Sequence, residues 1–258
     1  MGRKDLVMTS AGVLVALLGF LPLLGMAAAV PCPPPQVDVE GGSSATTPCT
    51  AATGSFSTNF GSTENPLSEG GVWIDGKVVG LDWNNPMTVP GRATASVQSG
   101  LGASRYDDSI AHLSASLQPM TANQFAQGTV YKASGYSTSG GHEVELLLRF
   151  QTTAHNARGY EILWGLRGYI AIVRWNGPLG NYTPLYDPGA GSISVPNDGD
   201  VLRAEISGST IKVFKNGVQV ASVSDSTYSS GQPGVGFWPV DGATPEKLGW
   251  KAFQAGNL

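Results

Sequence analysis

Three short runs of alternating apolar and polar residues follow one another between residues 201 and 224. The apolar positions are Leu202, Ala204 and Ile206, then Ile211 and Val213, then Val218 and Val220, with Val223 as a further candidate. Such alternation predicts strands with one buried face. The second and third runs are joined by Asn216-Gly217, a pair that tolerates the positive φ angles of a type I′ hairpin turn. This segment therefore predicts an antiparallel meander.

The same kind of pattern predicts strands along most of the chain. They are expected at 55–60, 72–74, 93–97, 110–117, 128–132, 142–152, 159–164, 169–175 and 248–254. No amphipathic helical stripe of ten or more residues follows the first 29 residues, so the pattern indicates an all-β domain.

The meander and the segment after it resemble a known superfamily. The residues that carry the resemblance are 207–218, Ser-Gly-Ser-Thr-Ile-Lys-Val-Phe-Lys-Asn-Gly-Val, and 225–237, which end in Gly-Val-Gly-Phe. They are similar to the end of a concanavalin A-like jelly roll, the fold of laminin-G-like modules, legume lectins and secreted glucanases. The resemblance is clearest over residues 129–253. It implies a β-sandwich of two antiparallel sheets in which the last strand often pairs beside the first, and in which one concave face often binds polysaccharide. It identifies no particular ligand.

The first 54 residues have a composition unlike the rest. Arg3 and Lys4 precede a long apolar run that ends in small residues at 27–29, which predicts a signal peptide over residues 1–29. An uncleaved membrane anchor is the alternative, because the run approaches the ~20 residues that span a bilayer. Residues 30–54 read as a Pro-, Ser- and Thr-rich spacer, in which Cys32 and Cys49 are expected to form a disulfide. The β-sandwich domain is then 55–258.

Charge and location narrow the choice of partner. Only 13% of the residues are charged and the net charge is −4, which argues against nucleic acid because such partners require clustered Lys and Arg. We expect a secreted or cell-surface protein that does not remain in the membrane after signal cleavage, with a polysaccharide or other glycan as its partner. The sequence does not indicate the oligomeric state.

The strand that begins at His142 carries two carboxylates. Alternation places Val144, Leu146, Leu148 and Phe150 on one face, and Glu143, Glu145, Leu147, Arg149 and Gln151 on the other. Secreted glucanases of the resembling fold carry Glu-x-Asp-x-Glu or Glu-x-Asp-x-x-Glu on one strand. Glu143 and Glu145 fit the first two acidic positions of this pattern loosely, with Glu in place of Asp at the second, and Leu147 or Leu148 stands at the third. A glucanase would therefore need a third acid from elsewhere, with Asp187 or Glu161 as candidates; otherwise the two glutamates pair with neighbouring arginines.

Other residue types suit a polysaccharide lyase or a non-catalytic site. Arg149 and Tyr160, with Gln151, His155, Arg158 and Arg174, are the types that a lyase needs to neutralise a uronate and move a proton. For simple binding, aromatic rings stack on sugar faces and polar groups bind the hydroxyls. The residues expected to hold a ligand in this way are Glu145, Arg149, Tyr160, Arg174, Trp175 and Tyr182, with Trp73 and Trp83 as further candidates at the rim.

The sequence predicts no cofactor and no metal site, with calcium at Asp107-Asp108 or Asp198-Gly-Asp200 as the alternative. The favoured function is non-catalytic carbohydrate binding on the concave sheet. One alternative is a glycoside hydrolase or polysaccharide lyase that uses Glu143, Glu145, Arg149 or Tyr160 on the same face. The other is an adhesive or structural module, which would present a filled, flat face.

Overall fold

The computed structural model describes residues 54–99, 106–138, 140–240 and 242–258. The expected signal peptide, and both cysteines of the expected disulfide, lie outside the described residues. The described part consists of strands and one 3-10 turn. In chain order they are β1 (Ser55–Thr58), β2 (Trp73–Asp75), β3 (Pro86–Val89), β4 (Arg92–Ala95), β5 (Ser109–Leu113), β6 (Gln124–Lys132), β7 (His142–Thr153), β8 (Asn156–Gly165), β9 (Tyr169–Gly177), β10 (Tyr182–Tyr186), β11 (Val201–Ser207), β12 (Thr210–Lys215), β13 (Val218–Ser224), β14 (Gln232–Pro239), η2 (Pro245–Lys247) and β15 (Leu248–Asn257).

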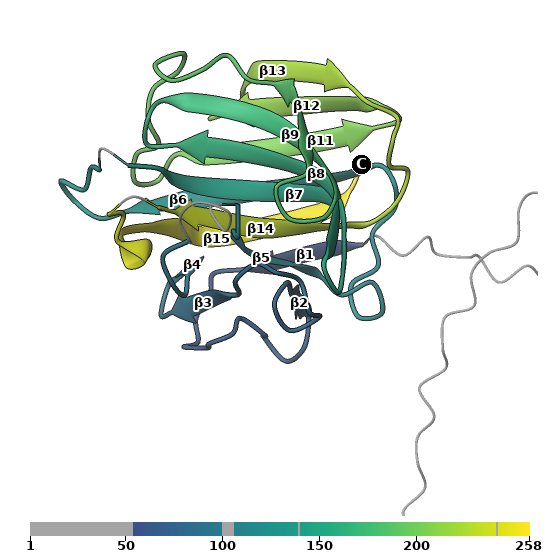
Figure 1. Ribbon diagram of the computed structural model, residues 1–258, viewed down its shortest axis with the longest axis horizontal. Helices are drawn as coiled ribbons and strands as arrows, with labels where there is room; N and C mark the ends of the chain where they lie inside the picture. The colour runs from purple at the N-terminus through teal and green to yellow at the C-terminus, as the bar shows by residue number, and fades with distance from the viewer. Residues whose placement is uncertain (1–53, 100–105, 139, 241) are drawn as a thin grey trace, which may run out of the picture. The chain divides into compact units, whose positions relative to one another are not determined.

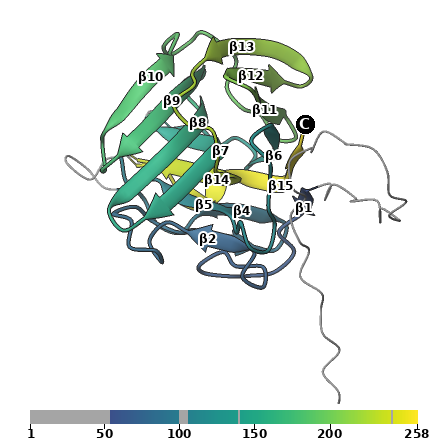
Figure 2. The same ribbon diagram turned by 90° about the vertical axis from the view of Figure 1, so that its right-hand side faces the viewer.

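Two antiparallel sheets pack face to face as a β-sandwich (Figures 1 and 2). One sheet has the order β13-β12-β11-β6-β15-β4-β3, with β1 paired to β15. The other, which we call the site sheet, has the order β10-β9-β8-β7-β14-β5-β2. The expected pairing of the last strand with the first is confirmed, since Ser55 lies opposite Gly256 in β15.

The meander forms as predicted, with one correction. Asn216 and Gly217 adopt φ angles of 49° and 79°, as a type I′ turn requires. The apolar residues of β11 and β12 are buried in the core between the sheets. Val218, however, is 67% exposed, because a register shift at Val213/Phe214 makes Ala221, opposite Val213, the buried residue of β13.

The face pattern of β7 also breaks at a bulge. Val144, Leu146 and Leu148 point into the core between the sheets, as predicted. Arg149 has a φ of 49°, and the pairing of β7 with β8 shifts between Leu148 and Gln151. Phe150 therefore joins Leu147 on the outer face of the site sheet, which corrects the expectation that it shares a face with Val144.

That outer face carries a second, smaller hydrophobic cluster. Leu81 and Trp83, from the loop after β2, cover Leu147, Phe150 and Trp175. The loop thus fills part of the face, and the face is neither a flat surface nor a continuous open groove. Within the described residues, no helix has the length and hydrophobicity needed to cross a membrane.

Candidate functional site

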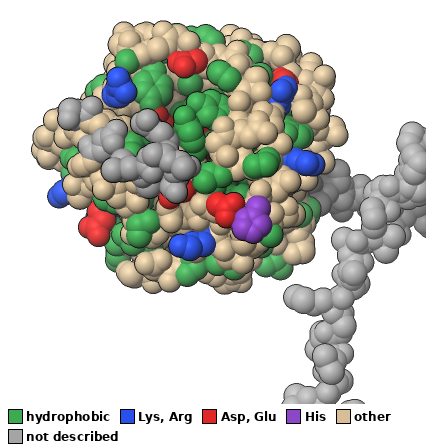
Figure 3. Space-filling view, in the orientation of Figure 1, with side chains coloured by type: hydrophobic (Ala, Val, Ile, Leu, Met, Phe, Trp, Pro, Cys, Tyr) green, Lys and Arg blue, Asp and Glu red, His purple; other side chains and the backbone are tan. Residues whose placement is uncertain are grey.

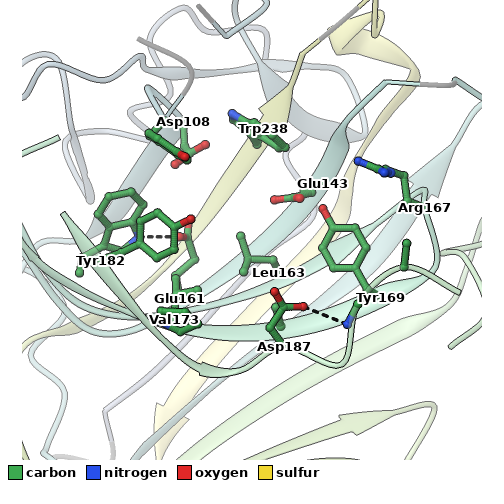
Figure 4. Close-up of a pocket in the computed structure, with 16 residues that line it drawn as sticks. Asp108, Glu143, Glu161, Leu163, Arg167, Tyr169, Val173, Tyr182, Asp187 and Trp238 are labelled. Atoms are coloured by element: carbon green, nitrogen blue, oxygen red, sulfur yellow. Dashed lines mark hydrogen bonds between the residues drawn. The ribbon is translucent and has the colours of Figure 1, made fainter. Parts of the chain in front are cut away.

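A pocket of about 430 Å³ opens on the outer face of the site sheet, beside the second hydrophobic cluster. Its walls combine aromatic rings, carboxyl groups and one arginine (Figure 4). The lining residues are Tyr106, Asp108, Glu143, Glu161, Leu163, Arg167, Tyr169, Ala171, Val173, Trp175, Tyr182, Pro184, Asp187, Gly189, Ala190 and Trp238. In the space-filling view, hydrophobic side chains gather near the middle of the visible face with acidic ones among them, and Lys and Arg lie toward its edge (Figure 3).

Carboxyl groups from three segments converge at the floor of this pocket. Asp108, Glu145 and Glu161 each place an oxygen within 4.8 Å of the other two; we call these three the acid cluster. Glu161 lies on β8 opposite Leu147, next to the position at which the glucanase pattern lacks its third acid. Glu161, one of the two residues considered as the source of that acid, lies beside Glu145 in this cluster. Asp187, the other candidate, lies at the wall of the pocket.

A glycine makes room for the carboxyl group of Glu145. Gly236 of β14 pairs with Glu145 on one side and with Ile110 of β5 on the other. A Cβ atom at Gly236 would lie 2.2 Å from Oε2 of Glu145, far inside van der Waals contact. The side chain of Glu145 therefore lies over β14, between its own strand and the segment that carries Asp108.

The acids at this floor are almost fully buried. Glu145 and Glu161 are 0% exposed, and Asp108 and Glu143 only 5% and 4%. Burial is the main cause that raises the pKa of all four, because it disfavours the charged form. The charge of Glu161 raises the pKa of the other three further, whereas Arg167 acts against the rise at Glu143. The two oxygens of Glu145 and Oε1 of Glu161 receive no hydrogen bond from an N–H or hydroxyl donor in the described residues. The carboxyl groups of Glu145 and Glu161 are instead close enough to share a proton with each other.

Aromatic residues form one wall of the pocket. Nε1 of Trp175 donates a hydrogen bond of 2.5 Å to Oε2 of Glu161, which fixes the orientation of that carboxyl. The ring of Trp175 packs against Tyr182 at 5.3 Å and against Trp83 at 4.4 Å between centroids. Tyr182 is 36% exposed and also packs against Tyr106. The wall is therefore rigid at its base and accessible at its edge.

The opposite side of the pocket carries Trp238, Arg167 and Tyr169 (Figure 4). Trp238 pairs with Glu143 across β14 and β7. The ring of Tyr169 lies over Gly165, where a Cβ would come within 2.6 Å of it. This arrangement places flat apolar surfaces beside carboxyl groups, which suits a ligand with both C–H faces and hydroxyls.

The structure separates the six residues expected to bind ligand. Trp175 and Tyr182 line the pocket, and Glu145 lies beneath it in the acid cluster. Tyr160 instead points into the core between the sheets, and its hydroxyl donates to Oδ1 of Asp225. Arg174 is paired with the same Asp225 at 2.5 Å. The prediction that both residues lie on the pocket face is therefore wrong. Tyr160 precedes Glu161 and Arg174 precedes Trp175, and neighbouring residues of a strand point to opposite faces of the sheet.

Arg149 is also held elsewhere. Its Nε, Nη1 and Nη2 atoms donate to the backbone carbonyls of Ala122, Tyr228 and Gly208 at 2.7 to 2.8 Å. The bulge at Arg149 turns this side chain away from the pocket, which corrects its expected place beside Glu143 and Glu145. The residues expected to assemble a lyase site are therefore not gathered in the pocket, and His155 pairs with Asp82 in an exposed turn.

Other expectations have mixed outcomes. Trp73 and Trp83 are buried rather than at a rim. Asp198 pairs with Lys251, and Asp200 accepts a hydrogen bond from the backbone of Asn197 within a turn. Among the aromatic and charged residues of the pocket, those not predicted as ligand contacts include Tyr106, Asp108, Arg167 and Trp238. Asp108 was considered only as a calcium ligand, and no spacing in the sequence connects it with Glu145.

Comparison with known proteins supports the fold. No family model and no curated protein matches the sequence. A GlcNAcα1-4Gal-releasing endo-β-galactosidase from Clostridium perfringens is similar in structure, with a TM-score of 0.50 and 10% identity over 78% of this chain and 62% of that chain. The carbohydrate-binding module CBM66 from Bacillus subtilis gives 0.46 and 15% identity over 74% and 95%. The carbohydrate recognition domain of Emp46p gives 0.48 and 10% over 76% and 96%. At such identities the likeness concerns the fold alone.

Proposed function

We propose that this chain is a secreted carbohydrate-binding protein that holds the end of an extracellular glycan in the pocket of the site sheet. The observation that carries the proposal is the pairing of aromatic walls, formed by Tyr182, Trp175 and Trp238, with buried carboxyls at the floor. Sugars present apolar C–H faces that stack on aromatic rings and hydroxyls that bind to carboxyl groups. The endo-β-galactosidase with the same fold acts on a glycan, which agrees with this choice of ligand class.

The size of the pocket favours a short ligand over a long chain segment. At about 430 Å³ it falls in the lower part of the range of small-molecule pockets, about 300 to 1,000 Å³. Leu81 and Trp83 fill the neighbouring part of the sheet face. We therefore propose that a terminal sugar unit enters the pocket while the rest of the glycan stays outside. A purely structural module would instead present a filled face.

The test applies the purified chain to a panel of soluble and insoluble glycans and measures retention and released sugar together. We expect retention that Tyr182→Ala and Trp238→Ala each weaken at least tenfold. Tyr131→Ala serves as the matched control, because this tyrosine packs beneath Arg92 and does not line the pocket. Retention that neither pocket variant changes would contradict the proposed site.

Glycoside hydrolysis is the second candidate, favoured by the position of Glu161 opposite Leu147. In this mechanism Glu143 would attack the anomeric carbon, and the protonated Glu161 would give its proton to the leaving oxygen. Water would then release the sugar from Glu143, with Glu161 taking back a proton. Sugar release that is lost in both Glu143→Gln and Glu161→Gln would establish hydrolysis; retention without release would leave binding alone.

A further inference from the structure

We propose that the acid cluster, Asp108, Glu145 and Glu161, binds a calcium ion at the floor of the pocket. The three carboxyls come from the segment before β5, from β7 and from β8. They meet beside Gly236 of β14. Each offers an oxygen within 4.8 Å of the others. Hard oxygen ligands of this kind are those that calcium prefers.

The buried oxygens of Glu145 point to a ligand. Both receive no hydrogen bond from an N–H or hydroxyl donor in the described residues, which leaves a buried polar group poorly stabilised. Oε1 of Glu161 likewise has no such donor, while Oε2 accepts a hydrogen bond from Trp175. Without a cation, Glu145 and Glu161 can only share a proton between their carboxyl groups. A cation would pair with all of these oxygens and would offset the mutual repulsion of three carboxylates.

The space for the carboxyl of Glu145 is a separate indication. No side chain other than hydrogen at position 236 leaves Oε2 of Glu145 in its place, because a Cβ there would lie 2.2 Å away. The absence of a side chain allows the carboxyl to extend over β14 toward Asp108. The arrangement brings Asp108 close to Glu145 although β14 lies between β7 and β5.

The type of ligand favours calcium over magnesium. The three oxygens lie within 4.8 Å of one another, close enough to bind one ion at the calcium–oxygen distance of about 2.3 to 2.6 Å. Magnesium keeps several waters and rarely takes a site made of protein carboxylates alone. Asp108 and Glu161 also line the pocket, so water or a ligand hydroxyl entering from the pocket can complete the coordination shell.

Calcium binding and hydrolysis through Glu161 exclude one another. A carboxylate that coordinates a cation is ionised and holds no proton to give to a leaving oxygen. Non-catalytic glycan binding is compatible with the ion. The calcium site does not depend on the proposed function, and its test uses no glycan.

The experiment titrates CaCl2, and in parallel MgCl2, into the chelator-treated full chain by calorimetry. We expect one calcium per chain, binding that is at least tenfold weaker in Glu145→Gln, and weaker binding of magnesium than of calcium. Asp75→Asn is the matched control, since Asp75 is another buried acid with an unpartnered oxygen but lies outside the cluster. Calcium should raise the unfolding temperature of the unsubstituted chain and of this control, but not of Glu145→Gln.

Two results would overturn the calcium site. One is the absence of saturable binding at concentrations above the ~1 mM of the weakest extracellular calcium sites, which would leave a cluster that holds protons only. The other is unchanged binding in Glu145→Gln. If circular dichroism shows that this variant does not fold, Asp108→Asn takes its place with the same expected loss.

Discussion

The indole of Trp175 holds the carboxyl of Glu161 through a hydrogen bond of 2.5 Å between Nε1 and Oε2. The two residues lie on neighbouring strands, β9 and β8, and both are almost fully buried. The bond leaves Oε1 as the oxygen of Glu161 that receives no hydrogen bond from an N–H or hydroxyl donor in the described residues. It therefore links the aromatic wall of the pocket to the orientation of the acid at its floor.

Replacing Trp175 tests how much this hydrogen bond contributes to the stability of the fold. Trp175→Phe should lower the free energy of unfolding by about 1.5 to 3 kcal/mol through loss of the hydrogen bond to a carboxylate, in addition to the lost ring volume. Trp83→Phe is the matched control, because Trp83 packs on Trp175 but its own buried Nε1 has no partner. Urea unfolding of both variants gives the comparison, and equal losses would mean that the bond adds nothing.

The close approach of Glu145 to Gly236 gives a second prediction. Gly236→Ala should destabilise the chain by about 1 to 3 kcal/mol, the usual cost of overpacking, because the new Cβ displaces the Glu145 carboxyl. Adding Glu145→Ala should recover most of that loss. Gly61→Ala, whose Cβ would have 3.4 Å to its nearest atom, is the control for the general effect of alanine. Losses that simply add in the double variant would contradict the predicted clash.

A third prediction concerns Arg149, which three backbone carbonyls hold away from the pocket. Arg149→Ala leaves these acceptors without their donor, so we expect a loss of about 3 kcal/mol or more in unfolding free energy. Any glycan retention measured under conditions in which the variant stays folded should be unchanged. Arg158→Ala, an exposed arginine nearby on β8, should cost little. A stable Arg149→Ala that has lost retention would return this residue to the binding site.

The sequence predicts the strands of the sandwich well, because alternation and turn residues are local signals. The Asn216-Gly217 turn and the pairing of β1 with β15 follow from such signals and from the resemblance. The strands that were missed, β3, β10 and β14, contain prolines at Pro86, Pro184 and Pro233, which weaken a strand signal.

Less of the site can be predicted from the sequence, because its geometry depends on pairing between segments that are distant in the chain. Glu143 and Glu145 can be recognised on one strand, and Glu161 was a candidate for the third acid. Asp108 meets them only because β14 lies between β7 and β5, an order that no local pattern encodes. The bulge at Arg149 is likewise absent from the alternation, and it moves Arg149 and Phe150 from their expected faces.

The pH dependence of stability provides a prediction away from the pocket. Asp75 on β2 is 5% exposed, and Oδ1 has no partner. Burial, followed by the charge of Glu64, raises its pKa from 3.8 to about 7. The folded chain therefore binds more protons than the unfolded chain between pH 4 and 7, so this residue lowers the stability as the pH rises through that window.

Asp75→Asn removes this effect while preserving the shape of the side chain. A pKa difference of about 3 units corresponds to roughly 4 kcal/mol at most, so the stability of Asp75→Asn relative to the unsubstituted chain should increase by up to that amount between pH 4 and 7. It should then stay constant above pH 7. Urea unfolding of both proteins at intervals of pH measures the difference directly, and the acid cluster contributes equally to both. A difference that does not change with pH would mean that Asp75 ionises in the folded chain as it does in the unfolded one.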